Sequence, residues 1–413
     1  MDNKFSKGLE KKRPFKRGPS EKWKRLHKAS LIQKSLIQRD LPIMELISIK
    51  ALFLPGKFPG GDFFRIISGS HEKKLMVIIG DCPGQGLKTS MAESLLISLI
   101  DPYLNILLKG ETGRFLEELS REFYRKSDEK KFPTMTVVVI DGETGLTHYS
   151  NANGELPLLT QRNRVRQLET AKGMPIAHCE DPSYETKSFQ LEPGDRLLFF
   201  SGALPEMRTD QKNRLGYKKF MDIVSEENGS TNSRSFYSLL DRVEALNGTL
   251  PLDDDLALIS LQFLQPIERT NTYFREKDLE DLLSQNRRDL EKMDYKKDEI
   301  LRTDIVLREL YLNAFHHGNR GDERRKILVK SHVDCSGYSI VIEDEGEGFD
   351  RRTVEDPVGK MEEIFQRGIE REYTHGRGIV IAEQFSDSLE YNEKGNAVFL
   401  TLKRKENRLT SYS

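Results

Sequence analysis

Aspartates that adjoin glycines or follow apolar runs recur along the first two thirds of this 413-residue chain. Asp62 follows Gly-Gly, Asp81 follows the run LMVIIG, and Asp254 lies in LPLDDDLALI. A carboxylate at the end of a strand can meet others at one sheet edge without crowding. Oxygen ligands of this kind suit Mg²⁺ or Mn²⁺, and two such ions can orient a water and stabilise charge on a phosphoryl group. Each Asp-Gly pair alone is more typical of a turn.

A second group of polar residues lies on a predicted helix over residues 301–318. Glu309, Asn313 and His317 follow one another at four-residue steps, so they share one face. An asparagine there can hold a hydrated Mg²⁺, and a glutamate can orient a nucleophile. The alternative interpretation is an ordinary solvated stripe.

Glycine-rich segments follow this helix and predict a nucleotide pocket. In YSIVIEDEGEGFD, an aspartate at the strand end can accept a hydrogen bond from an adenine amino group while glycines admit the base. In THGRGI, glycines at a helix start would free backbone N–H groups for phosphates. The residues concerned are Asp344, Gly346, Gly348, Gly376, Arg377 and Gly378.

Strands mixed with helix pairs must position these residues, so the predicted fold class is α+β. Strands are expected at 74–80, 134–140, 146–151, 156–159, 196–200 and 257–263, and again at 326–332, 338–344, 389–392 and 397–403. Helices are expected at 88–108, 112–126, 217–224, 233–246, 301–318 and 378–385. The predicted organisation is a basic arm (1–20), a helix (21–42), a first domain (43–263), a charged linker (264–275) and a second domain (276–406).

The composition limits the function classes. Lys plus Arg number 65 against 66 Asp plus Glu, which argues against general nucleic-acid binding. The basic arm is read as a solvated tail, with a nucleic-acid or membrane-surface contact as the alternative. Three scattered cysteines give neither a disulfide framework nor metal-ligand spacing. Without a recognisable signal peptide or transmembrane run, a cytoplasmic location is expected.

The order of the aspartate motifs resembles the SpoIIE/RsbU-type branch of the PPM serine/threonine phosphatases. GGDFF is similar to the family's GGDyy, DCPGQG to DvsGHG, GDRLLFFSGALPE to GDrLllyTDGltE, and DDDLALI to DDxTlv. The resemblance covers about residues 30–263 and implies an α/β/β/α sandwich. It implies that Asp62, Asp81 and Asp254, with the backbone carbonyl of Cys82, bind Mn²⁺ or Mg²⁺ and carry the catalysis.

The chain departs from that pattern where the family has its TDG aspartate. Gly202 stands at this position, which removes one anionic oxygen from a site for hard cations. Gln85 replaces the histidine of DvsGHG. Two readings stay open: an active phosphatase, or a phosphatase-like module that binds its partner without turnover. Glu206 or Asp253 would be able to compensate.

The later motifs resemble the N, G1 and G2 boxes of GHKL ATPases, and most closely those of RsbW-type anti-sigma-factor serine kinases. The resemblance covers about residues 270–404 and implies an α/β sandwich that binds Mg²⁺-ATP. It assigns Glu309 as base, Asn313 to Mg²⁺ and Asp344 to adenine. A histidine kinase would need a phosphoacceptor histidine before this fold, and residues 264–300 contain none.

The two resemblances together imply a partner-switching regulator. Its phosphatase would act on a phosphorylated STAS-type anti-sigma-factor antagonist, and its ATPase domain would phosphorylate that protein or sequester a sigma factor. The alternative is a non-catalytic docking module whose partner binding the ATP site controls. A homodimer through residues 21–42 is a further expectation, beside plain packing of that helix.

Overall fold

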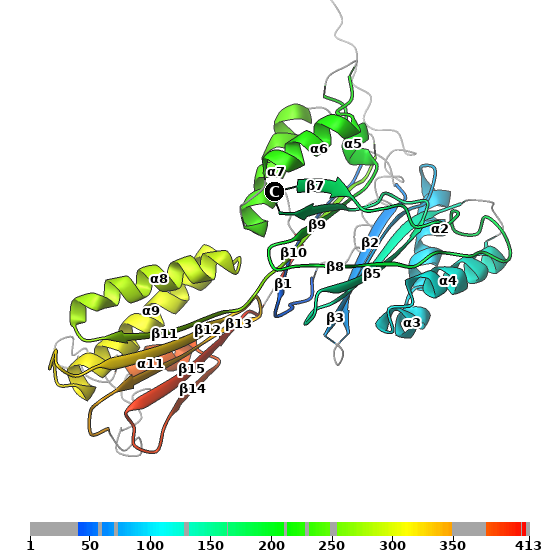
Figure 1. Cartoon of the computed structure of the whole chain (residues 1–413). Coiled ribbons are helices and arrows are strands. Elements are labelled where there is room, and N and C mark those ends of the chain that lie inside the picture. Colours follow the sequence, from blue (N-terminus) through cyan, green and yellow to red (C-terminus); the bar gives the residue numbers. More distant parts are fainter. Residues whose placement is uncertain are drawn as a thin grey trace, which may run out of the picture.

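The computed structural model describes residues 40–56, 60–69, 73–127, 132–162, 164–209, 213–227, 231–247, 254–348, 377–405 and 407–409. The predicted arm, nearly all of the predicted helix at 21–42, Asp253 and Gly376 lie outside these ranges. Two domains lie side by side in Figure 1, a larger one with two sheets and a smaller one with a single sheet.

Two five-stranded antiparallel sheets stack face to face in the first domain. Apolar side chains of both inner faces form the central core, which includes Ile49, Val77, Val138, Phe199 and Ile259. One sheet has the order β1-β10-β9-β6-β7, and the other has the order β2-β3-β4-β5-β8. Their bounds are β1 Ile47–Leu54, β10 Leu256–Phe263, β9 Arg196–Phe200, β6 Leu158–Gln161, β7 Arg164–Gln167, β2 Asp62–Gly69, β3 Lys74–Asp81, β4 Thr134–Asp141, β5 Leu146–Ala152 and β8 Lys187–Gln190.

Helices cover the outer face of each sheet (Figure 1). On the β2–β8 sheet lie α2 (Leu87–Ser98), the short turn η1 (Asp101–Tyr103), α3 (Leu104–Leu108) and α4 (Thr112–Lys126). On the other sheet lie α5 (Ala203–Glu206), α6 (Tyr217–Glu226) and α7 (Asn232–Asn247). This is the expected α/β/β/α sandwich, in which β3, β4, β9 and β10 are buried on both faces and the edge strands β7 and β8 are partly exposed.

The most apolar helical stretch is Leu87–Leu108. Within the described ranges it has the length and composition of a helix that can cross a membrane. The turn at η1, which contains Pro102, interrupts it, so the continuous helix expected over 88–108 is wrong. Leu96, Ile100 and Leu107 are fully buried against the sheet, which is how a core helix of a sandwich packs.

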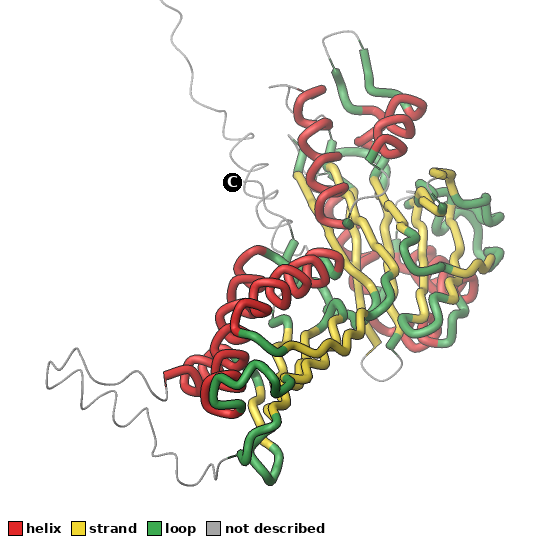
Figure 2. The backbone as a smooth tube through the Cα atoms, turned by 60° about the vertical axis from the view of Figure 1, so that its left-hand side comes forward, coloured by secondary structure: helices red, strands yellow, loops and turns green. Residues whose placement is uncertain are grey.

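The second domain has one antiparallel sheet with the order β11-β12-β13-β15-β14. The strands are β11 Ile267–Tyr273, β12 Ile327–Val333, β13 Gly337–Asp344, β15 Ala397–Lys403 and β14 Ser388–Tyr391. Its helices are α8 (Leu279–Lys292), α9 (Lys297–Asn313) and α11 (Arg377–Phe385), with the short turn η2 (Glu276–Asp278) before α8. Figure 2 shows them gathered on one face of the sheet, where they enclose a single apolar core.

Two boundaries differ from the expectations. The predicted linker 264–275 contains β11, which pairs along its whole length with β12. Its alternation of half-buried and exposed residues is typical of an edge strand, and its polar outer positions gave it the composition of a linker. The predicted helix 301–318 starts earlier, at Lys297, and its last residues, Ala314–Gly318, form a π-helical turn (η3).

A buried aspartate joins the domains. Asp294 lies between α8 and α9 and is 4% exposed. Its Oδ2 accepts a hydrogen bond from Ser48 Oγ at 2.6 Å and pairs with Lys50 Nζ at 3.2 Å, both on β1. Its Oδ1 accepts the Ser233 backbone N–H at 2.9 Å, at the start of α7. A carboxylate of the second domain therefore caps a helix of the first.

Candidate functional site

The β-sheet registers bring the predicted aspartates to one end of the sandwich. Asp62 and Asp81 are direct partners in the β2–β3 pair. In the other sheet, β10 begins directly after Asp255, and Asp255 Oδ1 accepts the Gly56 backbone N–H at 2.7 Å. Since Gly56 precedes the segment that leads into β2, both sheets contribute carboxylates to the same place.

Gly60 and Gly61 form the floor on which these oxygens converge. A Cβ atom on Gly60 would lie 3.0 Å from Asp254 Oδ1 and would clash with the carboxylate of Asp255. A Cβ atom on Gly61 would lie 2.8 Å from Asp81 Oδ1 and would clash with the backbone oxygen of Cys82. The Gly-Gly pair thus leaves the space that these oxygen atoms share, and any side chain would fill it.

The carboxylates of this cluster raise one another's pKa values. Burial is the largest cause that raises the pKa of Asp62 well above its usual range, and the Asp81 carboxylate is the next. A hydrogen bond with the Ser201 hydroxyl acts in the opposite direction. Desolvation and the Asp254 carboxylate raise the pKa of Asp81 to about 6. Burial is also the main cause that raises the pKa of Asp255 to about 6. These groups are therefore held in a place that disfavours their charge.

The donors of the cluster fit a hard divalent cation. Asp255 is 2% exposed, and its Oδ2 has no hydrogen-bond partner among the described residues. A buried orphan oxygen among like charges is stabilised by a cation. Among the described residues, no three His, Cys, Asp or Glu side chains are arranged so that they could hold a metal ion by themselves. The cluster instead combines carboxylates with the Cys82 carbonyl, and Mg²⁺ usually keeps several waters as ligands.

The second site is a cavity of about 470 Å³ between α9, η3, β13 and β15. Of the residues predicted to form a nucleotide pocket, Asn313, His317, Asp344 and Gly348 line this cavity, and Gly346 does not. Gly346 donates its backbone N–H to Asp344 Oδ1 at 2.8 Å and so orients that carboxylate. Arg377 and Gly378 begin α11, whose Ile379 also lines the cavity. Glu309, one turn before Asn313 on α9, is half-buried and outside this lining.

Close backbone approach explains the glycines around Asp344. A Cβ atom on Gly318 would clash with the carboxylate of Asp344, and one on Gly346 would clash with the Gly318 carbonyl. Burial is the largest cause that raises the pKa of Asp344. A buried acceptor at the end of a strand, with open space beside glycines, suits the amino group of a purine.

Two asparagines that hold the backbone around Asp344 were not among the predicted site residues, and one of them, Asn396, lines the cavity. Asn396 donates its side-chain amide to the Asp344 carbonyl at 2.7 Å, from the turn between β14 and β15. Asn319 accepts the Glu345 backbone N–H at 3.0 Å and donates to the Lys326 carbonyl at 3.1 Å. Asn319 directly follows His317 and Gly318 in the sequence, and its side chain is completely buried. No comparable signal distinguishes Asn396, because asparagines beside glycine are common in turns.

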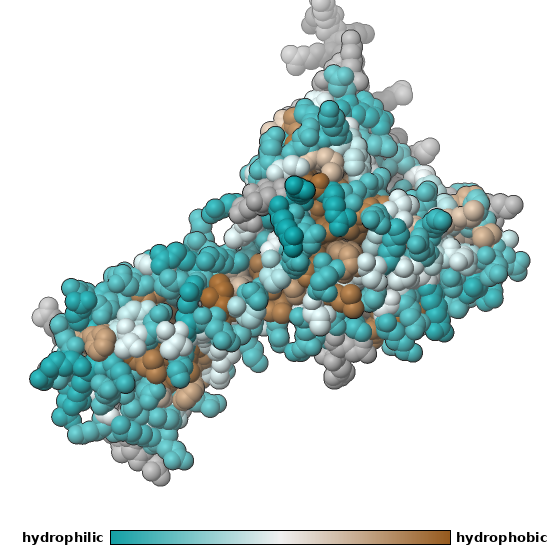
Figure 3. Space-filling view, viewed as in Figure 1, coloured by the Kyte–Doolittle hydropathy of each residue, from teal (hydrophilic) through white to brown (hydrophobic). Residues whose placement is uncertain are grey.

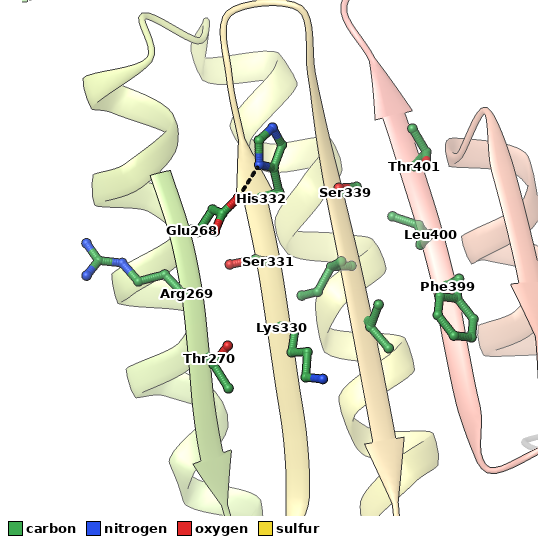
Figure 4. A pocket seen from close by; sticks show the side chains of 12 residues that line it. Glu268, Arg269, Thr270, Lys330, Ser331, His332, Ser339, Phe399, Leu400 and Thr401 are labelled. Carbon is green, nitrogen blue, oxygen red and sulfur yellow. Dashed lines mark ion pairs between the residues drawn. The ribbon is translucent and has the colours of Figure 1, made fainter. Parts of the chain in front are cut away.

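A shallow depression of about 380 Å³ lies on the sheet of the second domain, on the face opposite the helices (Figure 4). Glu268 and His332 approach to 3.5 Å across β11 and β12, and Lys330 and Phe399 lie further along the same face. None of the predicted site residues lines it. The visible surface is mostly hydrophilic, with small apolar patches (Figure 3), in keeping with a chain of which 32% is charged.

Comparisons with known proteins agree with this division. Residues 71–264 match the family model of Stage II sporulation protein E (SpoIIE), and residues 277–402 match the histidine kinase-like ATPase domain. Phosphoserine phosphatase RsbU of Bacillus subtilis is 24% identical over 240 residues, which cover 57% of this chain and 68% of that protein. An anti-sigma F factor of Clostridium perfringens is 32% identical over 108 residues, 25% of this chain and 73% of that protein.

A solved structure shares the fold of both domains together. The RsbU and RsbW domains of Rv1364c from Mycobacterium tuberculosis superpose with a TM-score of 0.59 and 20% identity, over 90% of this chain and 96% of that one. The order of domains and their sheets are therefore those of a known two-domain arrangement. This chain combines a SpoIIE-type (PPM) domain with a domain of the histidine kinase-like (GHKL) ATPase family.

Proposed function

We propose that the first domain removes phosphate from a phosphoserine or phosphothreonine of a STAS-type anti-sigma-factor antagonist. The observation that carries this proposal is the convergence of Asp62, Asp81, Asp254, Asp255 and the Cys82 carbonyl on Gly60–Gly61. Divalent cations bound there would activate water and neutralise the charge of a phosphoryl group. The name of the related phosphoserine phosphatase supports the substrate class.

The chain's own residues have separable tasks in this reaction. Asp81 and Asp254 present carboxylate oxygens to the cations, and Asp62 sits deeper, oriented by Ser201. Gly60 and Gly61 keep the centre free of side chains. The exposed side of Asp81 leaves a path by which a protein-bound phosphoryl group can approach from solvent.

We assign the second domain as a Mg²⁺-ATP site with serine-kinase activity toward the same partner. Asn313 would hold Mg²⁺, Asp344 would accept the adenine amino group, and Glu309 would take the proton of the partner serine. Phosphoryl transfer of this kind depends mainly on positioning and charge neutralisation. A sigma factor is the second partner class, by analogy with the related anti-sigma F factors. We propose that this protein binds both partners in the cytoplasm.

The phosphatase assignment is tested with a phosphorylated STAS antagonist, Mn²⁺ and the purified chain. We expect phosphate release that is lost by at least about 100-fold in Asp81→Asn, since a metal-ligand carboxylate is removed. Asp101→Asn is the matched control, because Asp101 is an exposed carboxylate that pairs with Arg65. Equal phosphate release from Asp81→Asn and the wild type would refute the assignment.

The kinase assignment is tested by transfer of labelled phosphate from ATP to the unphosphorylated antagonist. Asn313→Ala is expected to abolish the transfer. His316→Ala is the matched control, because His316 is exposed beside Glu276 and does not line the cavity. ATP-dependent labelling that survives in Asn313→Ala would contradict the proposed Mg²⁺ role.

One observation favours a second candidate function. Gly202 offers no carboxylate beside Ser201, so the first domain has one anionic ligand fewer than its family pattern. A first domain that docks the antagonist without turnover, under control of the ATP site, is the alternative. It predicts binding of the phosphorylated antagonist with no phosphate release at any Mn²⁺ concentration.

A further inference from the structure

An ion pair lies on the wall of the cavity in the second domain. Arg320 and Glu347 both line this cavity, and Arg320 Nη2 donates to Glu347 Oε2 at 3.1 Å. Among the described residues that line the cavity, Arg320 is the single lysine or arginine. An anionic ligand with a planar aromatic base would therefore meet one guanidinium there, and a guanidinium can bind either part of such a ligand.

The ion pair belongs to the end of the cavity that contains Asp344. Gly318, two residues before Arg320, lies so close to Asp344 that a Cβ atom on it would clash with the carboxylate. Glu347 follows Asp344 by three residues. Asn313, in contrast, lines the cavity from the last turn of α9. Arg320 and Glu347 thus lie beside the group assigned to the base rather than beside the group assigned to Mg²⁺.

A buried side chain holds the two loops of the ion pair together. Asn319, which directly precedes Arg320, is completely buried. Its Oδ1 accepts the Glu345 backbone N–H at 3.0 Å, and its amide donates to the Lys326 carbonyl at 3.1 Å. The backbone next to Arg320 is thereby fixed to the backbone two residues before Glu347, through hydrogen bonds that water does not reach.

Folding stability does not account for this ion pair. Arg320 has a φ of 57°, in the left-handed region, which is unfavourable for a residue with a Cβ atom. The side chains of Arg320 and Glu347 are 73% and 86% exposed, and ion pairs exposed to this degree contribute little. An unfavourable backbone conformation at the wall of a cavity points to a role in binding.

We infer that Arg320 lays the plane of its guanidinium over the purine base of the bound nucleotide and that Glu347 orients it. The inference rests on the proposed nucleotide site of the second domain. Guanidinium planes stack on nucleobases because they are flat and weakly hydrated. The carboxylate of Glu347 holds the guanidinium by its edge, which leaves its two faces available to the base.

Binding of adenosine and of Mg²⁺-ATP, measured by calorimetry on the full chain, tests this inference. Arg320→Ala is expected to weaken both ligands by the same factor, about fivefold, because the base is common to both. Arg324→Ala is the matched control, since Arg324 is 90% exposed, pairs with Asp322 and does not line the cavity. A loss for Mg²⁺-ATP alone would indicate a phosphate contact and overturn the inference, as would unchanged affinity for both ligands.

The variant Arg320→Lys separates stacking from charge. Lysine keeps the positive charge but has no planar group, so Arg320→Lys should bind adenosine about as weakly as Arg320→Ala does. Wild-type affinity in Arg320→Lys would overturn the stacking. A wild-type chain that binds neither adenosine nor Mg²⁺-ATP would refute the proposed nucleotide site and this inference with it. A wild type that binds both ligands, with Arg320→Ala as its equal, would refute this inference alone.

Discussion

At the scale of single residues, the aspartates are informative because their meaning depends on their neighbours. Gly60–Gly61 before Asp62 and the apolar run before Asp81 indicated strand ends, and the β2–β3 register places the two side by side. Asp254 and Asp255 arrive from another sheet, which spacing alone does not reveal.

The raised pKa values predict how metal binding depends on pH. Asp81 and Asp255 have pKa values of about 6 in the folded chain, above those of an unfolded aspartate. Protonation therefore favours the metal-free folded state, and this contribution is lost as the pH rises through about 6. Because Mn²⁺ must displace those protons, its stabilising effect should be larger at pH 7.5 than at pH 5.5.

Thermal unfolding with and without Mn²⁺ at the two pH values measures this difference. Asp101→Asn should leave the pH dependence unchanged, because Asp101 is exposed and lies outside the cluster. A Mn²⁺-induced rise in Tm that is the same at both pH values would mean that these carboxylates do not hold the cation.

A single methyl group tests the nucleotide pocket. Gly318→Ala places a Cβ atom against the Asp344 carboxylate, so we expect at least about a tenfold loss of ATP affinity from a clash worth about 1–3 kcal/mol. Gly337→Ala is the control at the far end of β13, where a Cβ atom would lie 3.2 Å from the Leu402 carbonyl. Equal ATP affinities in the two variants, measured by calorimetry, would contradict the role of Asp344.

At the scale of elements, hydrophobic periodicity predicted the helices and strands whose two faces differ in polarity. Short apolar runs predicted the strands that are buried on both faces. Strands β3, β4, β9 and β10 are nearly all buried and were found within a residue or two. Strand β11 was read as a linker because an edge strand can be polar. The π-helical turn at Ala314–Gly318 was read as part of an α-helix, because the sequence pattern of a helix does not distinguish the two.

The side chain of Asn319 connects two strands of the second domain by hydrogen bonds. Its side chain bonds to the start of β12 and to the residue after β13, and it is fully buried. Asn319→Ala leaves buried backbone groups unpaired, so we expect a loss of about 1–3 kcal/mol in the free energy of unfolding of the second domain. Chemical denaturation measures this loss, and Asn392, which bonds only within its own turn, gives the comparison variant Asn392→Ala. A smaller loss in Asn319→Ala than in Asn392→Ala would be contrary to the account.

At the scale of the whole molecule, the sequence predicted two domains but not how they meet. Asp294 lies in a charged segment whose composition resembles a solvated turn, yet its carboxylate bonds to Ser48, Lys50 and Ser233 of the first domain. Arg404 supports the same turn by donating to the Asp294 carbonyl at 2.9 Å. Such a contact depends on the final packing of two folded units, which local patterns do not encode.

Removing the Asp294 side chain should destabilise the contact between the two domains. Asp294→Ala leaves Lys50 buried without its partner and the start of α7 uncapped, so we expect a loss of about 3–5 kcal/mol in stability. Asp298→Ala, at an exposed position in the first turn of α9, should cost far less. Differential scanning calorimetry measures both, and equal transitions for the two variants would show that the Asp294 contact does not hold the domains together.

The central claim is that aspartates from two sheets gather to hold divalent cations. Crystals of the full chain soaked in Mn²⁺, measured at the manganese absorption edge, test it most directly. We predict anomalous density among Asp62, Asp81, the Cys82 carbonyl and Asp254. Manganese bound elsewhere in the molecule, with no anomalous density beside Gly60–Gly61, would contradict the claim.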